Sequence, residues 1–384
     1  MRVNMRVVRL STHIVTPTFS KLNLLGLLHI VSNTPSSLVH RIVVAGEHYE
    51  LYLLVGSHFE DELIQALRSA ANSIVCREGS QASSSQIIQI ENFRILKQLF
   101  TETLRRSIDI ESLIASANRD AILRSLREPV RHDTRTTSVK RSPSLLLAPE
   151  LGKYSTARMP YEDAYPQLDD RIDNKEAYLC TFIALLGLYA SFKLEVQTKR
   201  DKKKSVRELY IAIPAPRTHL HGLRASVLYW TGRRLAWLSQ QLLRSLRIGE
   251  EENWQVSVPG FVALVSPVIK DATTSMLGSL ELTLFKIVLE DQKQYVRNLV
   301  AIGMDSIYLF PDNLVQALLA EIESLGSLVS YVPDFFNLVG EYMLSGNDSI
   351  YIEALRVLAS ALQDRSIPSD VKRVISGILE YAAR

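Results

Sequence analysis

Eight residues, TKRDKKKS at Thr198–Ser205, carry five cationic side chains and one carboxylate. The cations are Lys199, Arg200, Lys202, Lys203 and Lys204. Long cationic side chains gathered on one short turn can neutralise successive phosphates of a nucleic-acid backbone. A lysine-rich turn can also simply keep the exposed edge of a hairpin soluble. We favour phosphate binding, because other cations accompany this segment.

The neighbouring sequence extends the positive charge. Residues 198–247 hold 12 lysines and arginines but only two acids. Arg207 follows the turn, and Arg233 and Arg234 lie on a predicted helix, LRASVLYWTGRRLAWLSQQLLRSLRI. A separate basic loop, PVRHDTRTTSVKRSPS, contributes Arg131, Arg135, Lys140 and Arg141. A clustered positive surface attracts polyanions whatever the fold beneath it, so we predict that these residues contact nucleic acid.

Catalytic alternatives are weaker. Arg127 and His132 have the R-x4-H spacing of some helical ribonucleases, where the pair positions and protonates the scissile phosphate, but Pro129 would interrupt the required helix. His219 and His221 could line a site, although no cysteine or convincing carboxylate accompanies them. We predict a chain that is not an enzyme, with a metal-independent ribonuclease as the alternative.

Other chemistry-bearing patterns have simpler interpretations. The acids of MPYEDAYPQLDDRIDNK could bind a divalent metal, but a solvated loop explains them better. Tyr229, Trp230 and Trp237 have helical spacing and are predicted to be core rather than a base-stacking platform. The sequence contains no GxxxxGK[ST], GxGxxG, GxSxG or HExxH motif. We therefore predict no cofactor and no metal.

Composition indicates a cytoplasmic globular protein. The chain has 384 residues, 47% of them hydrophobic, which suffices for a sizeable core. Its two cysteines, Cys76 and Cys180, are too few for a disulfide framework and fit a reducing compartment. The longest uncharged apolar run, Ala177–Phe192, has 16 residues and favours a buried helix over a membrane span.

Charge divides the chain. The net charge of +3 is the sum of +12 over residues 1–247 and −9 over residues 248–384. We expect the positive part to face nucleic acid and the acidic part to face protein partners or to stay clear of nucleic acid.

The elements that must position these residues give an α+β fold. VVRLST, the helix KLNLLGLLHIVS, the arms RIVVA and YELYLLV, the helix FEDELIQALRSAAN, and one further strand in SIVC or QIIQI follow the β-α-β-β-α-β order of ferredoxin-like and RNA-recognition domains. Residues 92–128 are predicted as two helices, which complete a first part at residues 1–128.

Two further parts complete the predicted organisation. Residues 129–255 form a basic middle part with the loop, a hairpin whose arms are FKLEVQT and VRELYIAIP, and the arginine-lined helix. Residues 256–384 are predicted as an acidic helical bundle, including a helix across TSMLGSLELTLFKIVLEDQKQYVRNLVAIG. Pro311-Asp312, Pro333-Asp334 and Pro368-Ser369 mark helix starts.

Taken together, the β-α-β-β-α-β opening, the loop PVRHDTRTTSVKRS, the tip KRDKKKS and the helical C-terminal part resemble subunits of archaeal type I-A CRISPR surveillance (Cascade) complexes. Length and the closing helices are most similar to the large subunit; the opening and the loop are also similar to the backbone subunit, whose glycine-rich segment is not evident here. The resemblance implies a non-catalytic role in antiviral defence. The chain would bind guide RNA or target DNA beside other subunits and help recognise foreign DNA, while base pairing reads the sequence.

Overall fold

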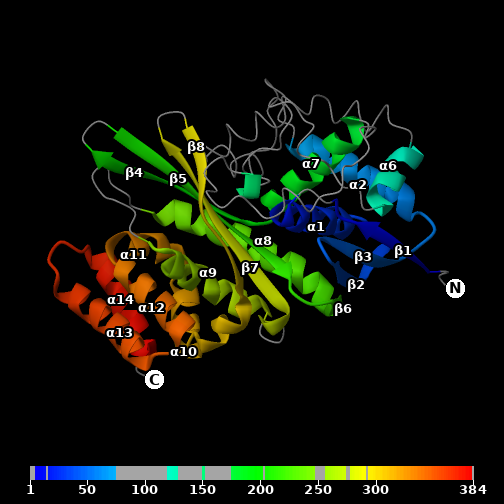
Figure 1. Cartoon of the computed structure of the whole chain (residues 1–384). Helices are drawn as coiled ribbons and strands as arrows, with labels where there is room; N and C mark the ends of the chain where they lie inside the picture. The colour runs from blue at the N-terminus through cyan, green and yellow to red at the C-terminus, as the bar shows by residue number, and fades with distance from the viewer. Residues whose placement is uncertain are drawn as a thin grey trace.

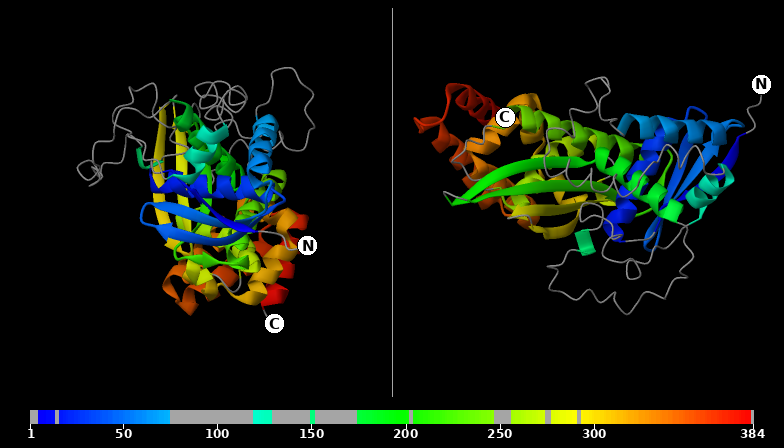
Figure 2. Two further views of the ribbon diagram at one scale, coloured as in Figure 1. Left: turned by 90° about the vertical axis from the view of Figure 1, so that its right-hand side faces the viewer. Right: turned by 90° about the horizontal axis from the view of Figure 1, so that it is seen from above.

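The computed structural model describes residues 5–13, 16–74, 119–128, 149–151, 174–201, 204–246, 256–273, 277–290 and 293–382. These residues form two four-stranded antiparallel sheets and a cluster of helices toward the C-terminus (Figure 1). The predicted α+β class is confirmed. Seen from above in Figure 2, the molecule is elongated, with the first sheet and the C-terminal helices at opposite ends and the second sheet between them.

The first sheet has the strand order β1, β3, β2, β6. This end of the molecule is built from β1 (Arg6–Ser11), α1 (Pro17–Ser32), β2 (Ser37–Ala45), β3 (His48–Val55), α2 (Phe59–Ile74) and β6 (Leu220–His221). In β3, Tyr49, Leu51, Leu53 and Val55 are buried, a period of two that fits a strand with one covered face. The predicted order of elements from β1 to α2 is confirmed.

The strand predicted after α2 has two candidate segments. The SIVC alternative is wrong in its first half, because Ser73 and Ile74 continue the helical turns of α2. The QIIQI alternative, at residues 86–90, lies outside the described residues. Of the two helices predicted across residues 92–128, the structure describes α6 (Arg119–Arg127).

The second sheet corrects the prediction for residues 274–303. Its strands are β4 (Phe192–Asp201), β5 (Lys204–Pro216), β7 (Leu280–Glu290) and β8 (Lys293–Gly303), in that order and all antiparallel. The apolar stretch predicted as a helix is therefore a hairpin. Leu280, Leu282 and Leu284 alternate with Glu281 and Thr283, a strand period that the surrounding apolar residues obscure.

This pairing also joins two predicted parts. β5 belongs to the predicted middle part and β7 to the predicted acidic bundle, yet they share ten register pairs from Arg207↔Leu289 to Pro216↔Leu280. The predicted boundary at residue 255 therefore passes between strands of one sheet.

Helices join the two sheets and form the C-terminal cluster. They are η1 (Pro149–Leu151), α7 (Asn174–Tyr189), α8 (Leu223–Ser245), α9 (Val258–Thr273), η3 (Leu277–Ser279), η4 (Met304–Leu309), α10 (Asp312–Ala320), η5 (Ile322–Ser324), α11 (Leu325–Tyr331), α12 (Pro333–Ser345), α13 (Asp348–Gln363) and α14 (Ser369–Ala382). The three predicted proline-marked starts are confirmed at α10, α12 and α14. None of the helices described is long and apolar enough to cross a membrane.

Glycines set the closest helix contacts. A Cβ atom placed on Gly26 of α1 would lie 1.8 Å from the carbonyl oxygen of Ile183 of α7, and one on Gly187 would lie 1.8 Å from that of Leu22. The two helix backbones thus touch through reciprocal glycines. Helices α9 and α12 approach in a similar way. A Cβ atom placed on Gly340 of α12 would lie 2.0 Å from the carbonyl oxygen of Pro259 of α9, and one on Gly260 of α9 would lie 2.2 Å from Asn337 Oδ1 of α12.

A buried ion pair also connects the two sheets. Lys21 of α1 is 7% exposed, and its Nζ lies 2.7 Å from Glu281 Oε1 and donates to Thr283 Oγ1 at 2.7 Å. Both acceptors belong to β7, so this lysine ties the helix over the first sheet to the second sheet.

We predict that Gly26→Ala destabilises the protein by about 3 kcal/mol or more, because the added methyl group would force α1 and α7 apart. Gly377→Ala is the matched control. There the nearest atom to the added Cβ is Glu321 Oε1 at 3.8 Å, so alanine should stabilise α14 by up to about 1 kcal/mol. Denaturant unfolding measures both changes, and shifts of the same sign and size would contradict the prediction.

Candidate nucleic-acid interface

The strands β4 and β5 extend into the basic stretch. Lys199 pairs with Ser205 and Asp201 with Lys204, with a register irregularity between Lys199 and Asp201. Lys199, Arg200 and Lys204 therefore lie on strand ends rather than in a loop, while Lys202 and Lys203 lie outside the described residues. The structure describes no side chain from residue 197 to residue 205, so phosphate contact by these five cations stays a prediction.

The three other predicted cations near this hairpin have protein partners. Arg207 lies 3.7 Å from Glu195 across the β4–β5 pair. Arg233 is half-buried, with its guanidinium 5.6 Å from the centre of the Tyr189 ring. Arg234 is exposed and forms an ion pair with Asp271. The remaining predicted contacts, Arg131, Arg135, Lys140 and Arg141, lie outside the described residues.

The outer face of α8 corrects a prediction. Tyr229 is buried as predicted, but Trp230 is 63% exposed and Trp237 is 37% exposed. The core side of α8 carries Leu228, Leu235 and Leu242, all fully buried. Each tryptophan comes two residues after one of these leucines, and two residues turn a helix by about 200°. The regular spacing of the leucines was the sequence signal that could have revealed this outward face.

Beneath α8 lies a buried polar cluster that the sequence did not reveal. Lys193 of β4 is 3% exposed, and its Nζ donates to the carbonyl oxygens of Leu188, Tyr189 and Ser191 at 2.9, 3.0 and 3.1 Å. Burial, and then the charge of Arg233, lower the pKa of Lys193 to about 7. A cation at the C-terminal end of a helix satisfies its last carbonyl groups, so Lys193 caps α7.

A neutral histidine completes this cluster. The imidazole of His29 is hydrogen-bonded through Nδ1 to the Tyr229 hydroxyl at 2.9 Å and packs edge-on against Tyr189. Burial, and then the charge of Arg233, lower the pKa of His29 to about 4. His29 is therefore uncharged at neutral pH.

His219 and His221 lie at the edge of the first sheet. His219 Nδ1 accepts a hydrogen bond from the amide of Val44 at 3.1 Å, and His221 of β6 pairs in register with Arg41 of β2. These contacts join β6 and the residue before it to the edge of the first sheet.

Arg127, the arginine of the ribonuclease alternative, belongs to a surface ion-pair cluster. Arg127 Nη2 donates to Glu60 Oε1 at 2.7 Å, and the same carboxylate receives Arg6 at 2.8 Å and Arg119 at 3.2 Å. The hydrogen bond from Arg127 is the main cause that lowers the pKa of Glu60. The cluster holds α6 against α2 and β1, while His132 lies outside the described residues.

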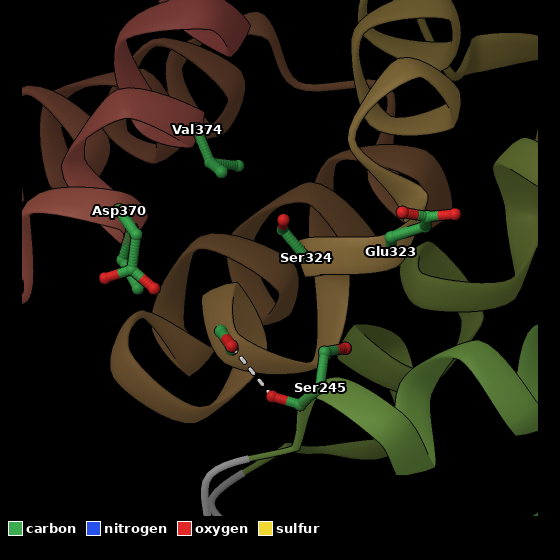
Figure 3. Close-up of a pocket in the computed structure, with 7 residues that line it drawn as sticks. Ser245, Glu323, Ser324, Asp370 and Val374 are labelled. Carbon is green, nitrogen blue, oxygen red and sulfur yellow. Dashed lines mark hydrogen bonds between the residues drawn. The ribbon is translucent and has the colours of Figure 1, made fainter.

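An open pocket of about 230 Å³ lies where α8, η5, α11 and α14 meet (Figure 3). Glu323 and Asp370 line it together with Ser245, Ser324 and Ser327, and Ser327 Oγ donates to the carbonyl oxygen of Ser245 at 2.7 Å. Its carboxylates would repel phosphate, so it does not belong to a nucleic-acid interface. Nowhere in the described ranges do three potential metal-ligating side chains cluster.

Comparison of the chain with models of protein families and with curated proteins finds no match.

We predict that Lys193 makes stability rise with pH. Its pKa is about 7 in the folded chain and about 10.4 in an unfolded one, so between these values the unfolded chain binds more protons. Across this window the free energy of unfolding of wild type, minus that of Lys193→Met, should increase by up to about 1.4 kcal/mol per pH unit. Denaturant titrations at pH 7, 8 and 9 measure the difference, and a constant value would contradict the prediction.

We predict that Arg127 stabilises the fold and does not cleave RNA. Arg127→Ala and Glu60→Gln should each lower the free energy of unfolding by about 0.5–1 kcal/mol, because the pair is partly exposed. The pKa of Glu60 is lowered on folding, so the Glu60→Gln effect should be complete at neutral pH and disappear as pH falls below about 4.

In metal-free buffer, wild type should leave labelled RNA intact. Cleavage that His132→Ala abolishes would support the ribonuclease alternative.

Proposed function

We propose that this chain is a non-catalytic nucleic-acid-binding subunit of a multiprotein assembly. The observation that carries the proposal is the excess of 12 cations over two acids across residues 198–247. This segment supplies the end of β4, all of β5 and all of α8, and α8 contains no acidic residue. The amide of Lys193 in β4 donates to Ser239 Oγ of α8 at 2.8 Å, so the two cation-bearing elements pack together.

The β4–β5 hairpin and α8 would contact phosphates in different ways. Lys199 and Arg200 lie at the end of β4, and Lys204 begins β5, with Lys202 and Lys203 between them in the sequence. We propose that these five cations reach phosphates as a basic hairpin tip. Arg233 and Arg234 are held by aromatic rings and by Asp271, so they would offer fixed guanidinium groups. Arg207 is paired with Glu195 and contributes less.

The first sheet supports a ferredoxin-like architecture for the N-terminal part. β3 lies between β1 and β2 and is antiparallel to both, so β1, α1 and β2 form a split β-α-β unit. We propose that a further strand, which follows α2 in the sequence, pairs with β1 on the side away from β3 and completes this architecture.

The particular assembly we propose is a type I-A CRISPR surveillance complex, with this chain as its large subunit and the backbone subunit as the second assignment. The acidic residues of 248–384 would face protein partners, and the basic residues would face guide RNA or target DNA in the cytoplasm. The order of elements and the division of charge along the chain support this proposal. The alternatives are a metal-independent ribonuclease and a purely structural interaction subunit, and the structural subunit would bind no nucleic acid in a salt-dependent way.

Salt-dependent binding tests the proposed function. Labelled single-stranded RNA, single-stranded DNA and duplex DNA would be titrated across a salt series with wild type and with a variant in which all five hairpin cations are serine. Each lost phosphate contact should make the slope of log K against log salt shallower by about 0.7 for single strands and about 0.9 for duplex. The five-serine variant should therefore bind more weakly and with a slope shallower by up to about 3.5–4.5.

A control variant distinguishes the effect of where the cations are removed from the effect of the change in the protein's net charge. Arg356, Arg365, Lys372 and Arg373 lie in the acidic C-terminal part, and their replacement by serine removes four cations elsewhere. This control should keep the wild-type slope. Equal slopes for wild type and the five-serine variant would instead make the hairpin end a solubilising turn.

A further inference from the structure

Two indole rings share the outer face of α8. Trp230 and Trp237 are seven residues apart, which is about two helical turns and about 10 Å along the axis. One exposed apolar side chain needs no explanation, but two tryptophans in line on one helix face are unusual for a solvated surface. Neither is needed for the core side of the helix, which its buried leucines already fill.

Guanidinium groups accompany the two rings. Arg234 lies between the tryptophans in sequence, with its guanidinium 5.7 Å from the centre of the Trp237 ring. Arg233 lies beside it, held over Tyr189. Because this face carries two guanidinium groups and α8 contains no acidic residue, the face attracts anions.

We propose that the tryptophan–arginine face, formed by Trp230, Arg233, Arg234 and Trp237, stacks unpaired bases of a single-stranded nucleic acid. This inference rests on the proposed function and names its substrate class. Every base presents a π-face that an indole can stack on, and the guanidinium groups lie where phosphates of the same strand would pass. The exposed Arg234–Asp271 pair is of the kind that contributes little energy, so a phosphate can replace the carboxylate.

The geometry selects single strands over duplex. Bases inside a duplex are already stacked, and presenting one to an indole requires unpairing it at a cost of a few kcal/mol. The distance of about 10 Å between the rings corresponds to about three nucleotides at the 3.4 Å rise of a stacked strand. The face thus suits a short run of unpaired bases.

The test is a titration of the full chain with labelled oligothymidine of about 15 nucleotides and with a labelled duplex of the same length. Anisotropy of the label measures binding by every variant, and indole fluorescence is followed in wild type. The variants are Trp230→Leu, Trp237→Leu and the double replacement, which keep an apolar face for protein contacts but remove the π-system. Tyr308→Leu, which removes a 49% exposed aromatic ring from η4, is the matched control. Unchanged thermal unfolding would establish that every variant is folded.

Stacking predicts quenching of wild-type indole fluorescence by oligothymidine, with tighter binding of the single strand than of the duplex. Each tryptophan replacement should weaken single-strand binding by about 5-fold to 150-fold and leave the salt slope unchanged, whereas Tyr308→Leu should behave as wild type. Wild-type binding without quenching, or equal binding by the leucine variants, would overturn base stacking and leave the hairpin proposal standing. Absence of any wild-type binding at low salt would overturn both.

Discussion

Helices α1 and α7 cross in direct backbone contact, and this crossing connects the two sheets of the protein. At Gly26 and Gly187 the two backbones lie so close that any side chain would meet a carbonyl oxygen of the opposite helix. α1 covers the first sheet, and α7 leads directly into β4 of the second sheet. The glycine crossing therefore fixes how the two sheets lie relative to one another, and the Lys21–Glu281 pair holds the same junction electrostatically.

Helix α8 connects the first sheet with the C-terminal helices. It starts beside β6 at the edge of the first sheet and ends beside α11, where Ser245 Oγ accepts a hydrogen bond from the amide of Gly326. Gly232 approaches the end of α7, since a Cβ there would lie 2.4 Å from the carbonyl oxygen of Ala190. Because the opposite side of α8 makes these packing contacts, the side chains of Trp230 and Trp237 face outward.

The same packing determines which positive charges can meet a ligand. Lys193 and Lys21 are buried and bound to carbonyl, carboxylate and hydroxyl groups of the chain itself, because a buried charge without partners would be too costly. Arg207, Arg233 and Arg234 are engaged as well, though nearer the surface. The cations of this segment therefore differ in their access to phosphates, and we assign the proposed contacts mainly to the hairpin end and the outer face of α8.

Local patterns in the amino-acid sequence were enough to predict the alternating strand β3, the amphipathic helix α2, the proline-marked starts of α10, α12 and α14, and the two arms of the β4–β5 hairpin. The sequence could not determine that residues 280–290 and 293–303 form strands, because an apolar run suits a buried helix or a buried strand equally and the choice depends on pairing with β5. Nor could it find the partner of Arg127, which lies 67 residues away in Glu60, or the outward direction of Trp230. These features depend on which elements meet across the fold, and such meetings are decided by packing between residues distant in sequence.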